Sequence, residues 1–227
     1  VNLVALESAK GIWNALIVLI VIWPAIFIYE VTHEAGAFEV FKNGMQKFSP
    51  NELLQVISIG WVFVSFLQGV TGFGVPVAVG APLLTGIGLV PLWAVVIPLL
   101  GHAWANTFGT LSVAWQALIF QTGITDVGLI NSIALWAASF LWIFNVITGL
   151  SISWFYGKKE AVKKGLPAVL IISTIHGGGQ LILSQINQTV ANFVMTCISL
   201  GVVFLLGKTK WYNQPWSIKN SRIMDRS

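Results

Sequence analysis

Residues 66–90 read FLQGVTGFGVPVAVGAPLLTGIGLV, and the apolar stretch around them runs from Leu53 to Thr125 without one Asp, Glu, Lys or Arg. The exposed loops of a soluble domain need charged side chains, so this stretch excludes a soluble fold. At about 1.5 Å of rise per helical residue, the stretch is long enough to cross a hydrocarbon layer of about 30 Å about three times.

The composition indicates the same class of protein. The chain is 56% hydrophobic and 9% charged, and its mean hydropathy is +0.82. Its eleven tryptophans suit the boundary between lipid headgroups and acyl chains. We therefore predict an all-α, polytopic membrane helix bundle with discontinuous or re-entrant helices. It forms one transmembrane domain over residues 1–216, followed by a polar tail over residues 217–227 that is mobile by Asp225.

The net charge of +4 comes from two basic clusters at the ends of apolar segments. These are Lys158, Lys159, Lys163 and Lys164, and Lys208, Lys210, Lys219, Arg222 and Arg226. Positive residues that flank spans mark the cytoplasmic side, so we expect the Lys158–Lys164 loop and the C-terminal tail to lie in the cytoplasm, below the plasma membrane. Because both clusters adjoin spans, we expect no nucleic-acid partner.

The expected helices follow from apolar runs and their interruptions. Residues 11–31 predict a first span with a kink at Pro24, and Phe38, Phe41, Met45 and Phe48 predict a helix in the interface or a connector packed on the protein. Ser49 to Glu52 is a capping box with proline at the first helical position. The later predicted helices cover residues 50–67, 75–89, 91–100, 110–120, 127–156, 165–184 and 187–206.

The first interruption contains the first half of the candidate site. Broken backbone at membrane depth is tolerated where it is buried in protein or lines a water-filled cavity. We expect the start of the second half-helix to offer backbone N–H groups to an anion. The predicted substrate-binding residues here are Gln68, Thr71, Gly72, Phe73 and Gly74. The alternative is that these glycines only permit close helix packing, and sequence alone leaves open whether residues 68–90 re-enter or span.

The second interruption, from Gly101 to Thr110, is polar in the middle of an apolar stretch. We predict that Asn106, Thr107 and Thr110 complete a pocket that faces the first break, because two discontinuous helices that meet are typical of secondary transporters. Helix-to-helix hydrogen bonds by Asn and Thr are the alternative.

Histidines are the candidate proton carriers. His102 is the predicted proton-coupling residue, and a buried neutral histidine bonded to a carbonyl is the alternative. His176, which precedes three glycines, is interpreted as part of a helix irregularity, and His33 as part of a solvated face.

The charge inventory limits the substrate class. The spans contain no Lys or Arg, which suits a small monovalent anion that travels with a proton and excludes a di- or triphosphate. No motif of a hydrolase, a metalloprotease or a dinucleotide-binding enzyme is present, so we expect no enzyme activity, no cofactor and no metal site. A single cysteine, Cys197, excludes an intrachain disulfide.

At these residues the chain resembles the L-lactate permease family, whose members carry lactate and glycolate with protons. The resemblance is based on residues 66–79 (FLQGVTGFGVPVAV), on residues 105–109 (ANTFG) and on the segment from Lys158 to Pro167 between two spans. It extends from about Gly11 to Trp216. It implies a proton-linked symporter of a small monocarboxylate in the cell membrane.

Two departures from the family pattern change what the resemblance implies. Family members resemble one another in a glutamate where this chain has Gln68, so proton coupling moves toward His102 or another residue. Family proteins are about twice as long, and the resemblance covers an N-terminal half without its inverted-topology partner. We expect a fragment, a split gene product or a decayed copy, which would work as a carrier by pairing with a second half-transporter chain or a copy of itself. The alternatives are a channel with a neutral lining and a non-transporting membrane subunit.

Overall fold

The computed structural model describes residues 2–36, 40, 44, 49–72 and 74–226, and the regular secondary structure of these residues is helical, without a strand. Three helical segments of this part are long and apolar enough to cross a membrane: Glu52–Val70, Val127–Ser184 and Gln188–Gly207. The prediction of an all-α membrane helix bundle is confirmed.

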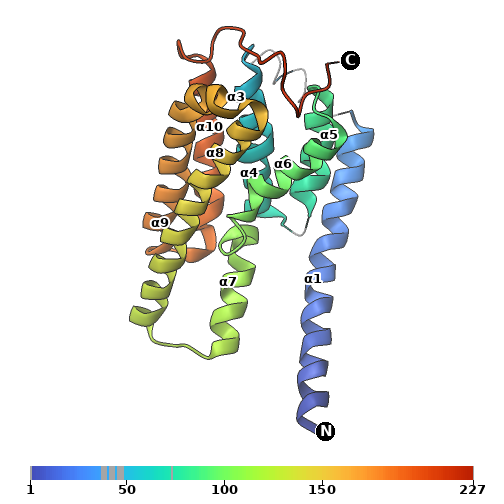
Figure 1. Cartoon of the computed structure of the whole chain (residues 1–227). Helices are drawn as coiled ribbons and strands as arrows, with labels where there is room; N and C mark the ends of the chain where they lie inside the picture. Colours follow the sequence, from blue (N-terminus) through green and yellow to red (C-terminus); the bar gives the residue numbers. More distant parts are fainter. Residues whose placement is uncertain (1, 37–39, 41–43, 45–48, 73, 227) are drawn as a thin grey trace.

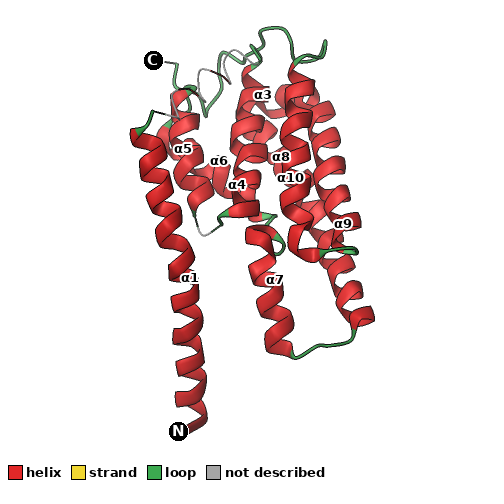
Figure 2. Ribbon diagram, turned by 180° about the vertical axis from the view of Figure 1, so that it is seen from behind, coloured by secondary structure: helices red, strands yellow, loops and turns green. Residues whose placement is uncertain are grey.

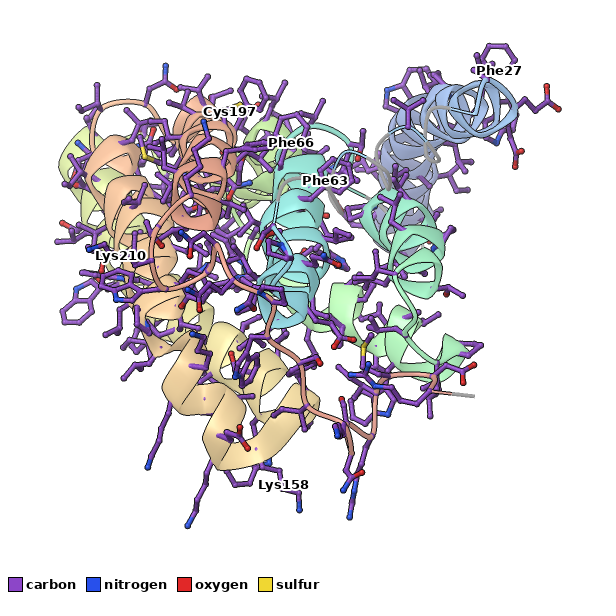
Figure 3. The ribbon with its side chains drawn as sticks, turned by 90° about the horizontal axis from the view of Figure 1, so that it is seen from above. Phe27, Phe63, Phe66, Lys158, Cys197 and Lys210 are labelled. Atoms are coloured by element: carbon purple, nitrogen blue, oxygen red, sulfur yellow. The ribbon has the colours of Figure 1, made fainter. Side chains whose placement is uncertain are left out.

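Helix α1, Asn2–Glu34, stands at the edge of the molecule beside α5, and its N-terminus lies at the end opposite the C-terminus (Figure 1). The helix begins earlier than predicted and includes Pro24. Its apolar side chains Trp13, Trp23 and Phe27 are exposed, and Phe27 points away from the bundle in Figure 3, as lipid-facing residues do. The predicted helix through Phe38 and Phe48 lies outside the described residues.

An interior rod of helix follows, in three pieces: α3, Glu52–Ile57; a π-helical segment η1, Ser58–Phe63; and α4, Val64–Val70. The predicted N-cap, Ser49, is wrong. The N-cap of α3 is Asn51, whose Oδ1 accepts a hydrogen bond from the Leu54 amide at 3.0 Å. The Ser49 hydroxyl instead donates to the Tyr212 carbonyl at 2.8 Å, and this long-range contact moves the helix start two residues on.

Three short helices continue the chain: α5, Val75–Gly86; α6, Pro91–Ala103; and α7, Gly109–Thr122. Helix α5 returns from the middle of the molecule to the end where α3 begins, and α6 and α7 then descend in sequence (Figure 1). Twelve residues make α5 about 18 Å long, too short for a layer of about 30 Å. Of the two topologies left open for residues 68–90, the structure favours the re-entrant hairpin.

Helix α6 crosses the interior helical segment of residues 52–70 so closely that the two backbones are in contact. A Cβ atom added at Gly101 would overlap the carbonyl of Gly60, so only glycine fits there. The Ser65 hydroxyl donates to the Gly101 carbonyl at 2.9 Å, directly beside this crossing. Small residues thus let two helices approach closely, as in other membrane bundles.

The last helices form the hairpin predicted for residues 165–184 and 187–206. Helix α8, Val127–Ser173, bends back at Gly157 and Lys158, which have non-helical backbone angles, and continues into the π-helical η2, Thr174–Gly178, and into α9, Gly179–Ser184. Helix α10, Gln188–Gly207, then returns alongside (Figure 2). The two basic clusters meet at one end, where the Lys164 ammonium lies 6.0 Å from the centre of the Tyr212 ring. Figure 3 shows Lys158 and Lys210 at the periphery of the bundle.

The C-terminal tail packs across this end, contrary to the predicted mobility. Ile223 and Met224 are buried, and the Val90 amide donates to the Ile223 carbonyl at 2.9 Å. The Arg226 guanidinium forms an ion pair with Glu52 at 2.8 Å, and the Asp225 amide donates to the Gly88 carbonyl at 2.7 Å. The composition predicted a polar, mobile tail. In the structure its two apolar residues are buried, its Arg226 side chain binds α3, and its backbone bonds to the α5–α6 turn.

Candidate functional site

The predicted first break is present. Helix α4 ends at Val70, and α5 begins at Val75 after a turn in which Gly72 and Gly74 have φ of +62° and +89°. These positive φ values favour glycine, since an L side chain there costs roughly 1–2 kcal/mol. The sequence FLQGVTGFG therefore interrupts the helix at the position its glycines predict.

The hydrogen bonds of this break correct one part of the prediction. The Val75 amide donates to Gly72, and the amides of Val77 and Ala78 both donate to the Gly74 carbonyl, at 3.0–3.1 Å. Pro76 has no amide hydrogen. The first turn of α5 is thus committed to its own backbone. Within the described residues, Gly72 and Gly74 are the break residues whose amides have no backbone acceptor.

The second break is shifted along the chain from its predicted position, since it begins at Trp104 and not at Gly101 and ends at Ser112 and not at Thr110. A turn over residues 104–108 separates α6 from α7, and Thr110, Leu111 and Ser112 then have φ of +51°, +50° and +62°. Three consecutive non-glycine residues in the left-handed region store several kcal/mol of strain, at about 1–2 kcal/mol each. Such strain is concentrated at functional sites.

The two breaks contact each other. The Gln68 Nε2 atom donates to Asn106 Oδ1 at 3.1 Å, although the two residues are 38 positions apart. A Cβ atom at Gly72 would collide with Thr110 Oγ1, and one at Gly109 would lie 3.0 Å from Gln68 Cγ. The structure therefore brings together Gln68 and Gly72 from the first break with Asn106 and Thr110 from the second.

The other predicted residues have different surroundings. Thr71 is half-buried and its hydroxyl donates to the Leu67 carbonyl at 2.8 Å, while Thr107 is half-buried in the second turn. Phe73 lies outside the described residues. His102 Nδ1 lies 2.6 Å from the Pro98 carbonyl, and since a carbonyl only accepts, this nitrogen donates. This geometry agrees with the alternative to proton coupling given above for His102, a histidine bonded to a backbone carbonyl.

A layer of buried polar side chains behind the breaks was missed by sequence reasoning. Its members are fully buried and lack a hydrogen-bond partner for at least one polar atom within the described residues: Asn145, Ser173, His176, Gln180, Asn192 and Ser199. The signal that could have found them is the run of polar residues within otherwise apolar spans, which membrane helices rarely carry without a function. His176 lies in the π-helix η2, so the predicted helix irregularity is confirmed.

The described part of the chain has no group of three His, Cys, Asp or Glu residues that could hold a metal ion. Among the described residues, one cavity of about 430 Å³ and another of about 840 Å³ are lined by residues other than those of the two breaks. The larger lies between α1 and the end of α7, and the smaller lies at the bend of α8.

Comparison with known proteins agrees with this architecture. The family model described as L-lactate permease matches residues 1–224. An L-lactate permease of Halalkalibacterium halodurans is 26% identical over 89% of this chain and 38% of its own length. An L-lactate permease of Bacillus subtilis is 34% identical over 46% of this chain and 18% of its own length. A glycolate permease of Escherichia coli K12 is 32% identical over 50% of this chain and 20% of its own length.

The chain thus spans less than two fifths of the length of the curated relatives it matches. No solved structure matches it. The family model covers nearly the whole chain, and the apolar helices make it an integral membrane protein. On this evidence, the chain belongs to the L-lactate permease family.

Proposed function

We propose that this protein is a secondary transporter, or one half of one, that moves a small monocarboxylate such as lactate or glycolate together with a proton. The observation that carries the proposal is the direct contact of two broken helices at Gln68 and Asn106 within a stretch that has no charged side chain. Discontinuous helices that meet in the interior are the usual substrate site of secondary transporters. The names of the relatives, L-lactate permease and glycolate permease, supply the substrate class.

The site offers neutral hydrogen-bond donors to a carboxylate. Because the Gln68 amide NH₂ group donates to Asn106 Oδ1, the Asn106 NH₂ group is oriented away from Gln68 and remains a donor for a ligand. Asn106 is exposed, and Thr110 adds a hydroxyl beside Gly72. The amides of Gly72 and Gly74, which have no backbone acceptor within the described residues, add two further donors.

The absence of charge at the breaks suits a single negative charge. A carboxylate held by neutral donors alone in a low-dielectric interior keeps its full charge, so a proton that travels with it lowers the cost of crossing. We propose that the Lys158–Lys164 loop and the C-terminal tail face the cytoplasm. Since the relatives are longer, a second half-transporter chain or another copy of this chain is the expected partner.

The proposal is tested by ligand binding to the purified full chain in lipid nanodiscs. Radiolabelled L-lactate and glycolate should bind saturably, and Asn106→Asp should weaken binding at least about tenfold, because a carboxylate beside the ligand repels it. The matched control is Asn213→Ala, an exposed residue outside the breaks, which should bind as the parent does. Binding of neither acid, or equal binding by Asn106→Asp, would reject this site.

Flux measurements separate a carrier from the neutral-lined channel. In proteoliposomes, uptake that saturates with substrate and rises with an inward proton gradient supports a carrier. Ohmic current in a planar bilayer supports a pore instead.

A further inference from the structure

We infer that His176, with Asn192 and Gln180 around it, is the proton-carrying site of this protein, and that its imidazolium is the counter-charge of the bound carboxylate. The inference rests on the proposed function and adds to it the residue that takes up the coupled proton.

His176 is built into the interior as a group without a fixed partner. Its side chain is fully buried, and neither ring nitrogen has a hydrogen-bond partner of normal geometry among the described residues. Gln180, one helical turn further on, and Asn192 of α10 are also fully buried, with both polar side-chain atoms unpaired. Leaving such groups unsatisfied in a membrane interior is costly, so a cluster of them points to a ligand that completes it.

The local backbone is shaped for this cluster. His176 lies in η2, and π-helical turns of this kind are frequent at functional sites. Gly177 within η2 and Gly179 directly after it let neighbouring side chains approach, since a Cβ at Gly177 would collide with Trp142 of α8 and one at Gly179 with Met195 of α10. The histidine is therefore held between α8 and α10 at near-backbone distance.

His176 is connected to the two breaks by two routes. Its ring lies edge-on to Trp104, the first residue of the second break, with centroids 4.2 Å apart, and the Trp104 indole N–H donates to the Gly101 carbonyl at 3.0 Å. The Asn192 side chain faces the imidazole and also lies against α4, where a Cβ at Gly69 would be 3.2 Å from Asn192 Nδ2. Gly69 follows Gln68, so one layer of side chains separates His176 from the breaks.

No fixed charge competes for this role in the neighbourhood that the structure describes. The side chains placed against η2 are Trp142 from α8, Asn192 and Met195 from α10, and Trp104 from the turn after α6, and these four are uncharged. The titratable groups on the same elements lie elsewhere: Tyr156 and the lysines with Glu160 at the bend of α8, Cys197 on the surface of α10, and His102 in α6. α9 has none.

His102, the residue predicted for coupling, is less suited to it. Its Nδ1 atom is occupied by the Pro98 carbonyl, one turn back on its own helix. The side-chain neighbour of His176 is the uncharged Asn192 amide, which can donate to the neutral ring or accept from the protonated one, and no backbone carbonyl holds either ring nitrogen among the described residues.

The proton and the anion then bind as a pair. A proton from water forms an N–H bond at the lone pair of the neutral imidazole and gives it a charge of +1, and the carboxylate at the breaks supplies −1. In an uncharged, low-dielectric interior each charge favours the other, across a layer of side chains as well as in contact. By linkage, the anion must bind more tightly as the pH falls, and its binding must take up a proton.

The experiment measures L-lactate binding to the full chain in nanodiscs of neutral lipid between pH 5.5 and 7.5, where the carboxylate stays ionised. For the unaltered chain, the dissociation constant should fall with falling pH, approaching tenfold per pH unit. His176→Gln should bind with a dissociation constant independent of pH, while His102→Gln should keep the dependence. Cys197→Ser, on the exposed face of α10, controls for the preparation.

Each outcome decides the question. If His176→Gln retains the pH dependence, the inference is wrong and the proposed function stands. If the unaltered chain binds lactate without any pH dependence, the inference is wrong, and of the proposed function the carboxylate site stands but its proton coupling does not. If the unaltered chain binds neither lactate nor glycolate, the proposed function fails and this inference with it.

A second measurement avoids the variant in case it does not fold. In the ¹⁵N-histidine NMR spectrum of the unaltered chain at constant pH, L-lactate should convert one imidazole to the protonated form, and the same signal should respond in His102→Gln. An unchanged spectrum under saturating lactate would overturn the assignment.

Discussion

Gly72 and Gly74 both have positive φ but differ in what surrounds them. A side chain at either position meets the same backbone strain of about 1–2 kcal/mol. At Gly72 the added Cβ would also collide with Thr110 Oγ1, whereas at Gly74 it would meet nothing within 4 Å. We expect Gly72→Ala to lower the thermal midpoint and weaken lactate binding more than Gly74→Ala does. Thermal unfolding and ligand binding of both variants in detergent measure this difference. Equal effects of the two substitutions would contradict the close contact between Gly72 in the first break and Thr110 in the second.

The residues of the two breaks could be predicted from the sequence, whereas the choice between the two histidines could not. Gln68, Gly72, Asn106 and Thr110 could be found because glycine and amide side chains interrupt an apolar run. His176 could not be ranked above His102 from the sequence, since both are single histidines in apolar spans. Only the fold shows that Pro98 occupies one ring nitrogen of His102 and that the ring of His176 has no such partner.

At the scale of elements, the left-handed turn at the start of α7 makes a prediction with a definite sign. In an ordinary helix, Ala is more stable than Gly by about 1 kcal/mol. At Leu111, which is exposed and has φ of +50°, the order should be reversed, because alanine there carries strain that glycine avoids. We therefore expect Leu111→Gly to unfold at a higher temperature than Leu111→Ala.

The control for this comparison lies in the same helix. Ala117, beyond the left-handed turn, should lose stability on Ala117→Gly by about 1 kcal/mol. If Leu111→Ala proves more stable than Leu111→Gly, the turn at Thr110–Ser112 is not left-handed in solution.

The sequence predicted the presence of the helices more accurately than the residues at which they begin and end. Pro and Gly predicted breaks within residues 68–76 and 101–110, and the structure has turns at 71–74 and 104–108. Leu and Ser have no preference for left-handed backbone, so Leu111 and Ser112 were predicted as helix. Ser49 was displaced as N-cap by a contact with Tyr212, 163 residues away. Such long-range partners leave no local signal in the sequence.

At the scale of the whole molecule, Tyr212 fixes the tail to the bend of α8. Its hydroxyl accepts the Ala168 amide at 3.1 Å and donates to the Lys164 carbonyl at 2.9 Å, and burial raises the pKa of Tyr212 to about 12. Since the ordinary tyrosine pKa is about 10, this group's contribution to stability is complete below pH 10 and is lost as the pH rises toward 12. Tyr212→Phe should lower the free energy of unfolding by about 1–3 kcal/mol below pH 10, because it removes both hydrogen bonds between the Tyr212 hydroxyl and the backbone of α8.

This gap between Tyr212→Phe and the unaltered chain should narrow between pH 10 and 12. Chemical denaturation across that range measures it, and Trp211→Phe, an exposed neighbour without an ionisable group, should show no such narrowing. A gap that stays constant with pH would mean that the Tyr212 hydroxyl is solvated.

The arrangement of α8 predicts how the molecule sits in the membrane. Its first arm, residues 127–156, is about 45 Å long at about 1.5 Å per residue, more than a hydrocarbon layer of about 30 Å. The loop before it and the bend after it must therefore lie on opposite sides. The second arm and α10 together return the chain to the bend, so we expect Lys159 and Lys210 to share a side, and their positive charge predicts that this side is the cytoplasmic one. Single cysteines in a Cys197→Ser background test this with a membrane-impermeant maleimide. Thr125→Cys should react in intact cells, whereas Lys159→Cys and Lys210→Cys should react only in inverted vesicles. Reaction of Thr125→Cys and Lys159→Cys from the same side would require the first arm of α8 to lie along the membrane surface, and the two breaks could not then be at membrane depth.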